Sequence, residues 1–161
     1  MFEHDLTLEK AYHFARFDGD HLLSTASDHP ILLEAQTWRT VEHYYQAHIA
    51  GSPKWVAAIV DAKSAKDAYA INKPWYRFHK KGWRSERRVL MTRALYTKVQ
   101  MYPEVLQALM ETEELMVIET SAYDHYWGIG RDQRGDNMLG KIWMDIRRKM
   151  TEKNSESQAP S

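Results

Sequence analysis

Length, composition and charge set narrow limits on this protein. The chain has 161 residues, 43% of them hydrophobic, which suits one globular domain with a sizeable core. Its 22 basic and 22 acidic residues cancel, so bulk charge gives no argument for binding nucleic acid or a membrane. Cysteine is absent, which excludes disulfides, thiolate catalysis and cysteine-based zinc sites, and fits a cytoplasmic protein.

The two ends of the sequence are both polar. Residues 1–5 contain acids and lack the apolar stretch of a signal peptide. No apolar run approaches the ~18 residues of a transmembrane helix. Residues 151–161 are polar, and we find no internal repeat or linker before them. The sequence therefore predicts a single domain at 1–150 followed by a disordered tail.

The first fifty residues show a weak pattern and then a strong one. We predict a short helix at 8–16 and a brief strand at 31–33. Thr40 is a good N-cap for a helix that ends near Gly51. The expected buried face of that helix consists of Val41, Tyr44, Tyr45, His48 and Ile49.

The middle of the chain predicts four more helices. Ser52–Pro53 is typical of an N-cap and first helical residue, and Ser64–Asp67 of a capping box for a short helix closed by Lys73–Pro74. Longer periodic stretches begin near Ser85 and at Pro103. Their expected core residues are Trp55, Val56, Ile59, Val60, Met91, Ala94, Leu95, Val99, Val105, Leu106, Leu109 and Met110.

The last third predicts a strand, a long loop and a helix. Residues 115–118 are apolar and partly β-branched, which indicates a buried strand. A loop at 120–136 follows, and Asn137 is the expected cap of a helix whose last turn holds the basic residues 147–149. Its expected inner face is Leu139, Ile142, Trp143, Ile146 and Met150. The predicted fold class is mainly α with a few short strands (α+β).

Glu42 is the first residue that suggests chemistry. An acid in the first turn of a helix is explained equally well by the helix dipole. Alternatively, a carboxylate beside Tyr44 and Tyr45 can have a raised pKa and act as an acid or base. Gln46 lies one turn further on the same face, where it can bind substrate or orient Glu42.

Asp124 is a second carboxylate, in a loop rich in aromatic residues. A local cap or Asx-turn explains it as well as a function does. Hydrolysis of a glycosidic bond uses two carboxylates, one to protonate the leaving group and one to steer water or stabilise an oxocarbenium-like transition state. The sequence leaves open whether Glu42 and Asp124 form such a pair, and which of them is the acid.

Two other segments suit phosphate-bearing ligands. Gly128, Gly130 and Gly135 precede the last helix, where backbone N–H groups can bind a phosphate, although positive φ angles explain these glycines better. Residues 73–93 hold eight Lys/Arg against one Glu, interleaved with aromatic rings. Their alternative explanation is a solvated charged face.

Metal and serine-hydrolase chemistry have no support. His43 and His48 are five apart and poorly placed for one helical face, and no HExxH spacing is present. No GxSxG element is present either. We therefore expect no metal site and no cofactor.

Taken together, these motifs resemble the NADAR, or YbiA-like, family over residues 20–150. The resemblance is carried by the segments Trp38–Ala47, Trp83 with the basic helix start after it, Asp124–Gly130 and Gly135–Arg147. It implies a compact, mainly helical domain and a hydrolase with N-glycosidase activity. The family's functional positions fall on Glu42, Trp83, Asp124 and Trp127.

The resemblance implies a substrate but leaves alternatives open. Family members hydrolyse phosphoribosylamino-pyrimidine intermediates of riboflavin synthesis and release ribose 5-phosphate, while others remove ADP-ribose from modified guanine. A third alternative is a non-catalytic nucleotide- or nucleic-acid-binding module. We expect Glu42 and Asp124 to be catalytic. The expected substrate-binding residues are Trp83, Trp127, Tyr45, Gln46, Arg84, Arg87, Gly130 and Asn137.

Two departures from the family pattern bear on the ligand. The family's Ser-Asn-Phe-like turn is replaced here by Leu23–Ala26, which lacks the amide and the ring. Ile49 stands where the family tends to carry a lysine. Because we expect both positions to help hold the ligand, the departures bear on the substrate more than on the type of reaction.

Overall fold

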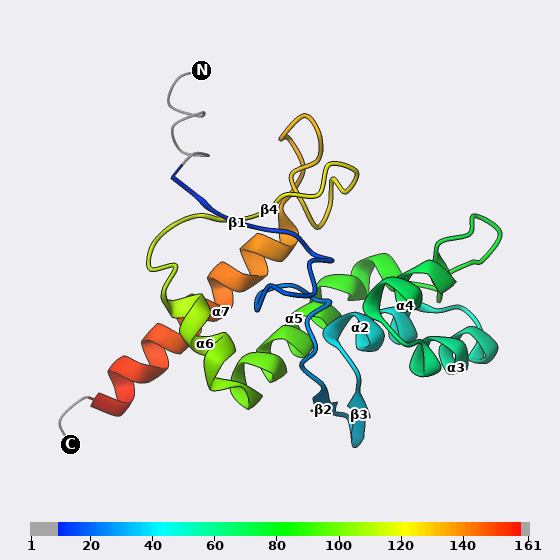
Figure 1. Ribbon diagram of the computed structural model, residues 1–161, viewed down its shortest axis with the longest axis horizontal. Coiled ribbons are helices and arrows are strands. Elements are labelled where there is room, and N and C mark those ends of the chain that lie inside the picture. Colours follow the sequence, from blue (N-terminus) through cyan, green and yellow to red (C-terminus); the bar gives the residue numbers. More distant parts are fainter. Residues whose placement is uncertain (1–9, 159–161) are drawn as a thin grey trace. The chain divides into compact units, whose positions relative to one another are not determined.

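The computed structural model describes residues 10–158, which form two compact units (Figure 1). One unit combines the described residues up to Ala15 with those from Gln107 onward. The other unit is the continuous segment Arg16–Leu106. Each unit contains one two-stranded sheet and some of the residues that the sequence predicted to be functional.

A tight hairpin opens the Arg16–Leu106 unit. Strands β2 (Ile31–Leu33) and β3 (Gln36–Trp38) pair antiparallel, with Ile31 opposite Trp38. The two turn residues, Glu34 and Ala35, have φ angles of 57° and 61°. Two consecutive left-handed residues are the geometry of a type I′ turn, whose twist matches that of the paired strands.

Helix α2 (Val41–Ile49) is the centre of this unit. It contacts α3 (Pro53–Asp61), α4 (Ala65–Asn72) and α5 (Trp83–Met101), and eight of its nine residues are buried. A helix enclosed on several sides buries polar as well as apolar side chains, and those polar groups need partners. This burial is the structural reason that Glu42 and Gln46 lie inside the unit.

The helix starts in this unit follow local sequence rules. The side chains of Thr40, Ser52 and Ser64 accept hydrogen bonds from the backbone N–H groups of His43, Lys54 and Asp67. The three predicted N-caps are therefore confirmed. Helix α5 begins at Trp83 rather than near Ser85, because Gly82 takes a left-handed conformation (φ 80°) and ends the preceding loop there.

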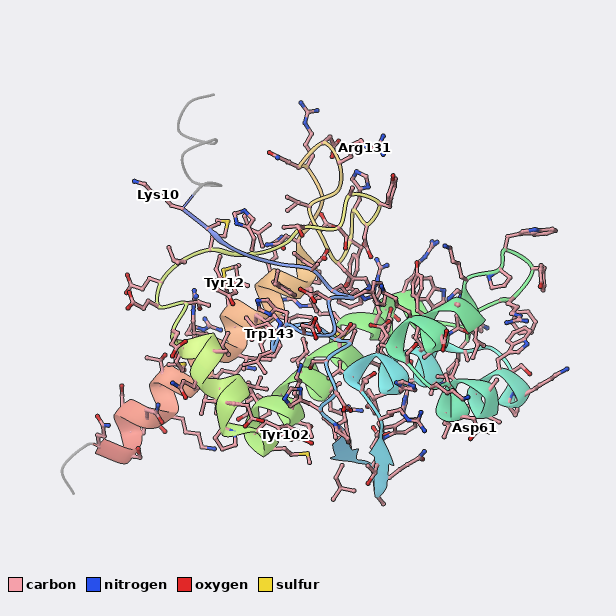
Figure 2. All side chains as sticks on the ribbon, in the orientation of Figure 1. Lys10, Tyr12, Asp61, Tyr102, Arg131 and Trp143 are labelled. Carbon is pink, nitrogen blue, oxygen red and sulfur yellow. The ribbon has the colours of Figure 1, made fainter. Side chains whose placement is uncertain are left out.

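The other unit is built on strand β4 (Val117–Glu119). β4 pairs in parallel with β1 (Tyr12–Phe14), which lies beside it in Figure 1. In this pairing Tyr12 lies opposite Val117. Helix α7 (Met138–Gln158) contacts β4, and Figure 2 labels Trp143, a fully buried side chain of this helix. The five predicted inner-face residues of α7 are all buried. Helix α6 (Pro103–Met110) starts at the predicted proline.

Several predictions for this part of the chain were wrong. Within the predicted helix at 8–16, residues 12–14 form β1, while residues 8 and 9 lie outside the described part. Strand β4 is shifted to Val117–Glu119, and residues 115–116 are exposed. Helix α7 continues to Gln158, so the basic residues 147–149 lie in its middle and most of the expected disordered tail is helical. Of that tail, residues 159–161 lie outside the described part.

Candidate active site

Glu42 is the hub of a buried hydrogen-bond network in the Arg16–Leu106 unit. Its side chain is 0% exposed. Arg16 donates from Nη2 to Oε1 at 2.5 Å and from Nε to Oε2 at 3.1 Å. Thr25 donates its hydroxyl to Oε2 at 2.5 Å, and Gln46 donates from Nε2 to Oε1 at 2.7 Å. Four donors fill the acceptor positions that an ionised carboxylate offers.

A second layer of contacts fixes the orientation of Gln46. Asn72 donates from Nδ2 to the Gln46 side-chain oxygen at 2.8 Å and to its backbone oxygen at 2.9 Å. Because the amide oxygen of Gln46 faces Asn72, its NH₂ group must face Glu42. The prediction that Gln46 orients Glu42 agrees with this contact. Asn72, which the sequence did not single out, orients Gln46 in turn.

Arg16 is the cation of this network. Its guanidinium is 3% exposed and lies 4.9 Å from the ring centre of Phe17 and 5.7 Å from those of Tyr45 and Tyr69. At these distances the rings attract the cation, which helps to offset its loss of hydration. Tyr45, a predicted substrate-binding residue, is buried and takes part in this packing.

No pattern in the sequence marks Arg16 or Thr25 as site residues. They lie 26 and 17 positions before Glu42, and only the fold brings them to it. Thr25 belongs to the turn that departs from the family pattern. That turn lacks the amide and the ring, yet it supplies a hydroxyl donor to the predicted catalytic carboxylate. This turn therefore takes part directly in the buried network around Glu42.

Three predicted residues gather at the start of α5. The Trp83 ring stacks on His79 with a centroid separation of 4.6 Å and an angle of 26° between the rings. The guanidinium carbons of Arg84 and Arg87 each lie 5.4 Å from the Trp83 ring centre. Burial, followed by the charge of Arg84, lowers the pKa of His79, which favours a neutral ring for stacking. His79 is a further member of this cluster that the sequence did not identify.

Residues 73–82 form the loop between α4 and α5 (Figure 1). Three large aromatic rings of this loop are exposed. Trp75 is 93% exposed, Tyr76 63% and Phe78 65%. The loop is nevertheless anchored, because His79 forms a bridge with Ala50 and the N–H of Lys80 donates to the Ile49 carbonyl at 2.8 Å. The aromatic rings are therefore exposed on a loop whose backbone is hydrogen-bonded to residues 49 and 50.

In the other unit, Asp124 organises its own loop. Its Oδ1 accepts hydrogen bonds from the backbone N–H groups of Tyr126 at 3.0 Å and Trp127 at 2.7 Å. This is the local cap that one interpretation of the sequence predicted. Trp127 is buried, and its ring meets that of Tyr126 edge-on at 4.7 Å. The catalytic role of Asp124 remains a prediction.

A third carboxylate, Glu119, lies at the end of β4 and was missed. It is fully buried, and Oε1 accepts the hydroxyl of Ser121 at 2.6 Å. The Ser121 N–H lies 3.1 Å from both carboxylate oxygens. A Cβ on Gly128 would collide with this carboxylate, so Gly128 is required by close approach. The buried acid and the glycine together fix the start of the loop at 120–136.

Positive φ angles explain only one of the three glycines singled out in this loop. Gly130 has a φ of 70°, whereas Gly128 and Gly135 are crowded by neighbouring atoms and lie outside the left-handed region. Gly130 borders a pocket of about 320 Å³. Figure 2 shows Arg131, which also lines that pocket, projecting from the loop. The remaining lining residues are His13, Thr120, Ala122, Ile129 and Gln133.

Asn137 does not cap α7 as predicted. Its Oδ1 accepts the N–H of Glu119 and its Nδ2 donates to the carbonyl of Val117, both at 2.9 Å. With a φ of 50°, the residue turns its amide toward β4 and pairs with that strand's backbone. Both hydrogen bonds join Asn137 to β4, and its contact with substrate stays a prediction.

Within residues 10–158, no group of three or more His, Asp or Glu side chains is placed to hold a metal ion. In the same part of the chain, no helix combines the length and the apolar character needed to cross a membrane.

Comparison with known proteins places this mainly helical architecture in one family. Residues 2–151 match the profile of the NADAR domain, so the chain belongs to the NADAR family. The NMR structure of the Escherichia coli protein YbiA has a TM-score of 0.80 at 26% identity, and the match covers 94% of this chain and 89% of that one. The fold class predicted from the sequence is thereby confirmed.

Curated relatives carry two kinds of name. N-glycosidase YbiA of Escherichia coli K12 is 30% identical over 75% of this chain and 76% of its own length. N-glycosidase Npun_R5314 of Nostoc punctiforme is 32% identical over 77% of this chain and 81% of its own. The chloroplastic riboflavin biosynthesis protein PYRR of Zea mays is 36% identical over 69% of this chain, but the match spans only 19% of the maize protein.

Proposed function

We propose that this protein is a hydrolase that cleaves the N-glycosidic bond of phosphoribosylamino-pyrimidine intermediates of riboflavin synthesis and releases ribose 5-phosphate. The observation that carries the proposal is the buried Glu42 carboxylate, which receives four hydrogen bonds from Arg16, Thr25 and Gln46. The names of the N-glycosidase relatives support the reaction type. The riboflavin relatives support the substrate class.

The contacts of Glu42 suit one of the two carboxylate roles. As the bond from ribose C1′ to nitrogen breaks, positive charge develops on the sugar, and a fixed anion in a buried setting stabilises it. Because four hydrogen bonds from fixed donors already occupy the acceptor positions of Glu42, we assign it this electrostatic role and not a proton transfer. Water then adds to C1′, and the leaving nitrogen takes up a proton. We assign the acid–base steps to Asp124.

The cluster at the start of α5 is the proposed binding surface for the remainder of the substrate. The Trp83 and His79 rings offer stacking for a pyrimidine. Arg84 and Arg87 offer guanidinium groups, which bind phosphate through paired hydrogen bonds. Arg84 is the better candidate for the phosphate because it is exposed, whereas Arg87 is only partly so.

The test is a chromatographic assay for release of ribose 5-phosphate. We expect Glu42→Gln and Asp124→Asn each to lower turnover by ~10²-fold or more. Glu152→Gln, a change of the same type at an exposed position on α7, serves as the control and should keep wild-type turnover. Retained activity in both site variants would refute the assignment of the carboxylates.

A second candidate substrate is ADP-ribosylated guanine in a single-stranded nucleic acid. Two features of the loop before α5 favour it. The rings of Trp75, Tyr76 and Phe78 are exposed and can stack on bases. The chain between Asp67 and Glu86 holds five Lys/Arg and no acid, which suits a phosphate backbone. Aromatic stacking contributes about 1–3 kcal/mol per base to such binding. Cleavage of ADP-ribosylated guanosine, with no cleavage of the pyrimidine riboside, would favour this substrate. Salt-sensitive oligonucleotide binding with no cleavage of either compound would favour a non-catalytic binding module.

A further inference from the structure

Lys98 is a buried cation with neutral partners. Its side chain is 1% exposed on the inner face of α5. Its ammonium donates to the Ser24 carbonyl at 2.7 Å and to the Ser27 hydroxyl at 2.6 Å. Among residues 10–158 no carboxylate lies within ion-pair distance of it, although buried charges are normally paired. A costly arrangement of this kind calls for a functional explanation.

The two acceptors of Lys98 lie on either side of Thr25. The Thr25 N–H donates to the Arg16 carbonyl, and the Thr25 carbonyl accepts the N–H of Glu42, both at 3.1 Å. The Thr25 hydroxyl donates to the Glu42 carboxylate. Thr25 therefore joins Arg16 to Glu42 through both its backbone and its side chain. Lys98 binds the chain before and after Thr25, at Ser24 and Ser27.

We propose that Lys98 is a positioning residue for the Glu42 carboxylate, acting through the turn at residues 24–27. The ammonium does not touch Glu42. It fixes the Ser24 carbonyl and the Ser27 hydroxyl, and this sets the position from which Thr25 donates to Glu42. The catalytic part of the inference rests on the proposed function of Glu42, whereas the structural part does not.

The charge state of Lys98 makes this coupling sensitive to pH. Burial lowers the pKa of Lys98 to about 7. On the turn side, burial and the charge of Lys98 lower the pKa values of His21 and His29. Around those histidines lie the acids Asp18, Asp28 and Glu104. On α2 and the hairpin, the charged or titratable groups Glu42, His43, His48 and Glu34 bind partners other than Lys98.

Deprotonation weakens the contact because a neutral amine is a poorer donor than an ammonium. Ser27 also contacts Nδ1 of His29 at 2.9 Å, so its hydroxyl links Lys98 to the histidine. Loss of the proton from Lys98 should therefore loosen both ends of the turn. The protonated form exists below about pH 7, and the positioning of Thr25 should be lost as pH rises through that value.

The test compares kcat against pH for wild type, Lys98→Met and Ser27→Ala. For wild type we expect kcat to fall ~10-fold as pH rises through 7, with little change in KM. Lys98→Met should have, at every pH, the low kcat that wild type has above pH 7, and its kcat should not fall as pH rises. Ser27→Ala removes one acceptor of the ammonium, so the fall should move to lower pH. Lys63→Met, an exposed lysine of the same unit, is the matched control and should behave as wild type.

Folded Lys98→Met with the wild-type profile would overturn the proposal. If that variant does not fold, Ser27→Ala decides, and an unmoved profile in it overturns the proposal instead. A general acid that loses its proton near pH 7 would also lower kcat at high pH. Ser27→Ala separates the two explanations, because it moves the pH of the fall only if Lys98 is the titrating group.

A measurement without turnover separates this inference from the proposed function. The amide NMR shifts of Thr25 and Glu42 should titrate together near pH 7 in wild type and at lower pH in Ser27→Ala. If wild type cleaves neither substrate but this titration is present, the proposed function fails and the positioning role stands. If the two amides do not titrate, the positioning role is wrong, whatever the activity.

Discussion

Replacing Arg16 with methionine tests the buried network most directly. The change keeps an unbranched side chain among the rings of Phe17, Tyr45 and Tyr69 but removes the two donors to Glu42. The carboxylate, 0% exposed, keeps only Thr25 and Gln46 as donors and has lost its counter-charge. Breaking a buried pair in this way costs about 3–5 kcal/mol of unfolding free energy.

That loss is large against the whole stability of a domain, which is about 5–15 kcal/mol. For a chain of this length it corresponds to a fall of roughly 6–20 °C in Tm. The assay is urea unfolding of wild type, Arg16→Met, Glu42→Gln and the double variant, which together form a double-mutant cycle. Arg84→Met, an exposed arginine of the same unit, is the control and should change stability by less than about 0.5 kcal/mol.

The double variant gives the decisive comparison. Because the Glu42→Gln side chain is neutral, removing Arg16 from that background leaves no buried charge unpaired and should cost much less than removing it from wild type. We expect a coupling energy of about 1–3 kcal/mol between the two positions. Additive effects, or a loss below about 1 kcal/mol for Arg16→Met alone, would refute a buried Arg16–Glu42 ion pair.

Three further results are expected. Thr25→Val removes one donor to Glu42 and should lower turnover ~10-fold while Thr25→Ser, which keeps the hydroxyl, stays near wild type in the same assay. Gly128→Ala places a methyl group against the Glu119 carboxylate and should cost about 1–3 kcal/mol in urea unfolding, whereas Gly19→Ala, which meets no close neighbour, should be tolerated. The pKa of Lys98 is about 7 in the folded chain and 10.5 in the unfolded chain. Between these two pH values the unfolded chain therefore binds more protons than the folded chain. Stability measured by urea unfolding should therefore rise with pH from about 7, by up to ~1.4 kcal/mol per pH unit, and Lys98→Met should remove this rise.

The features that the sequence predicted well depend on neighbouring residues. Thr40, Ser52 and Ser64 cap helices that begin one residue later, and the cap and the groups it satisfies lie within one turn of chain. The inner face of α7 follows in the same way from a 3.6-residue period. Local rules of this kind need no knowledge of the rest of the fold.

The features that were missed depend on distant residues. Strand β1 exists because it pairs with β4, about a hundred positions later, and the alternation within three residues is too short to signal it. Asn137 resembles a helix cap in the sequence, but the backbone groups of β4 offer its amide two partners. Arg16 and Thr25 lie 26 and 17 positions before Glu42, and only the fold brings them to it. The extension of α7 beyond residue 150 has no apolar period to indicate it, since residues 151–158 are all exposed.

The Lys98 arrangement shows a conflict between stability and the proposed activity. Burying an ammonium against one carbonyl and one hydroxyl destabilises the folded chain at every pH at which the lysine is charged. An apolar side chain of similar length would avoid that loss, but it could not hold the turn that brings Thr25 to Glu42. The same protonation that lowers stability below pH 7 therefore supports the proposed catalytic geometry. Opposite pH dependences of stability and turnover, both removed by Lys98→Met, are the combined signature that a purely structural lysine would not produce.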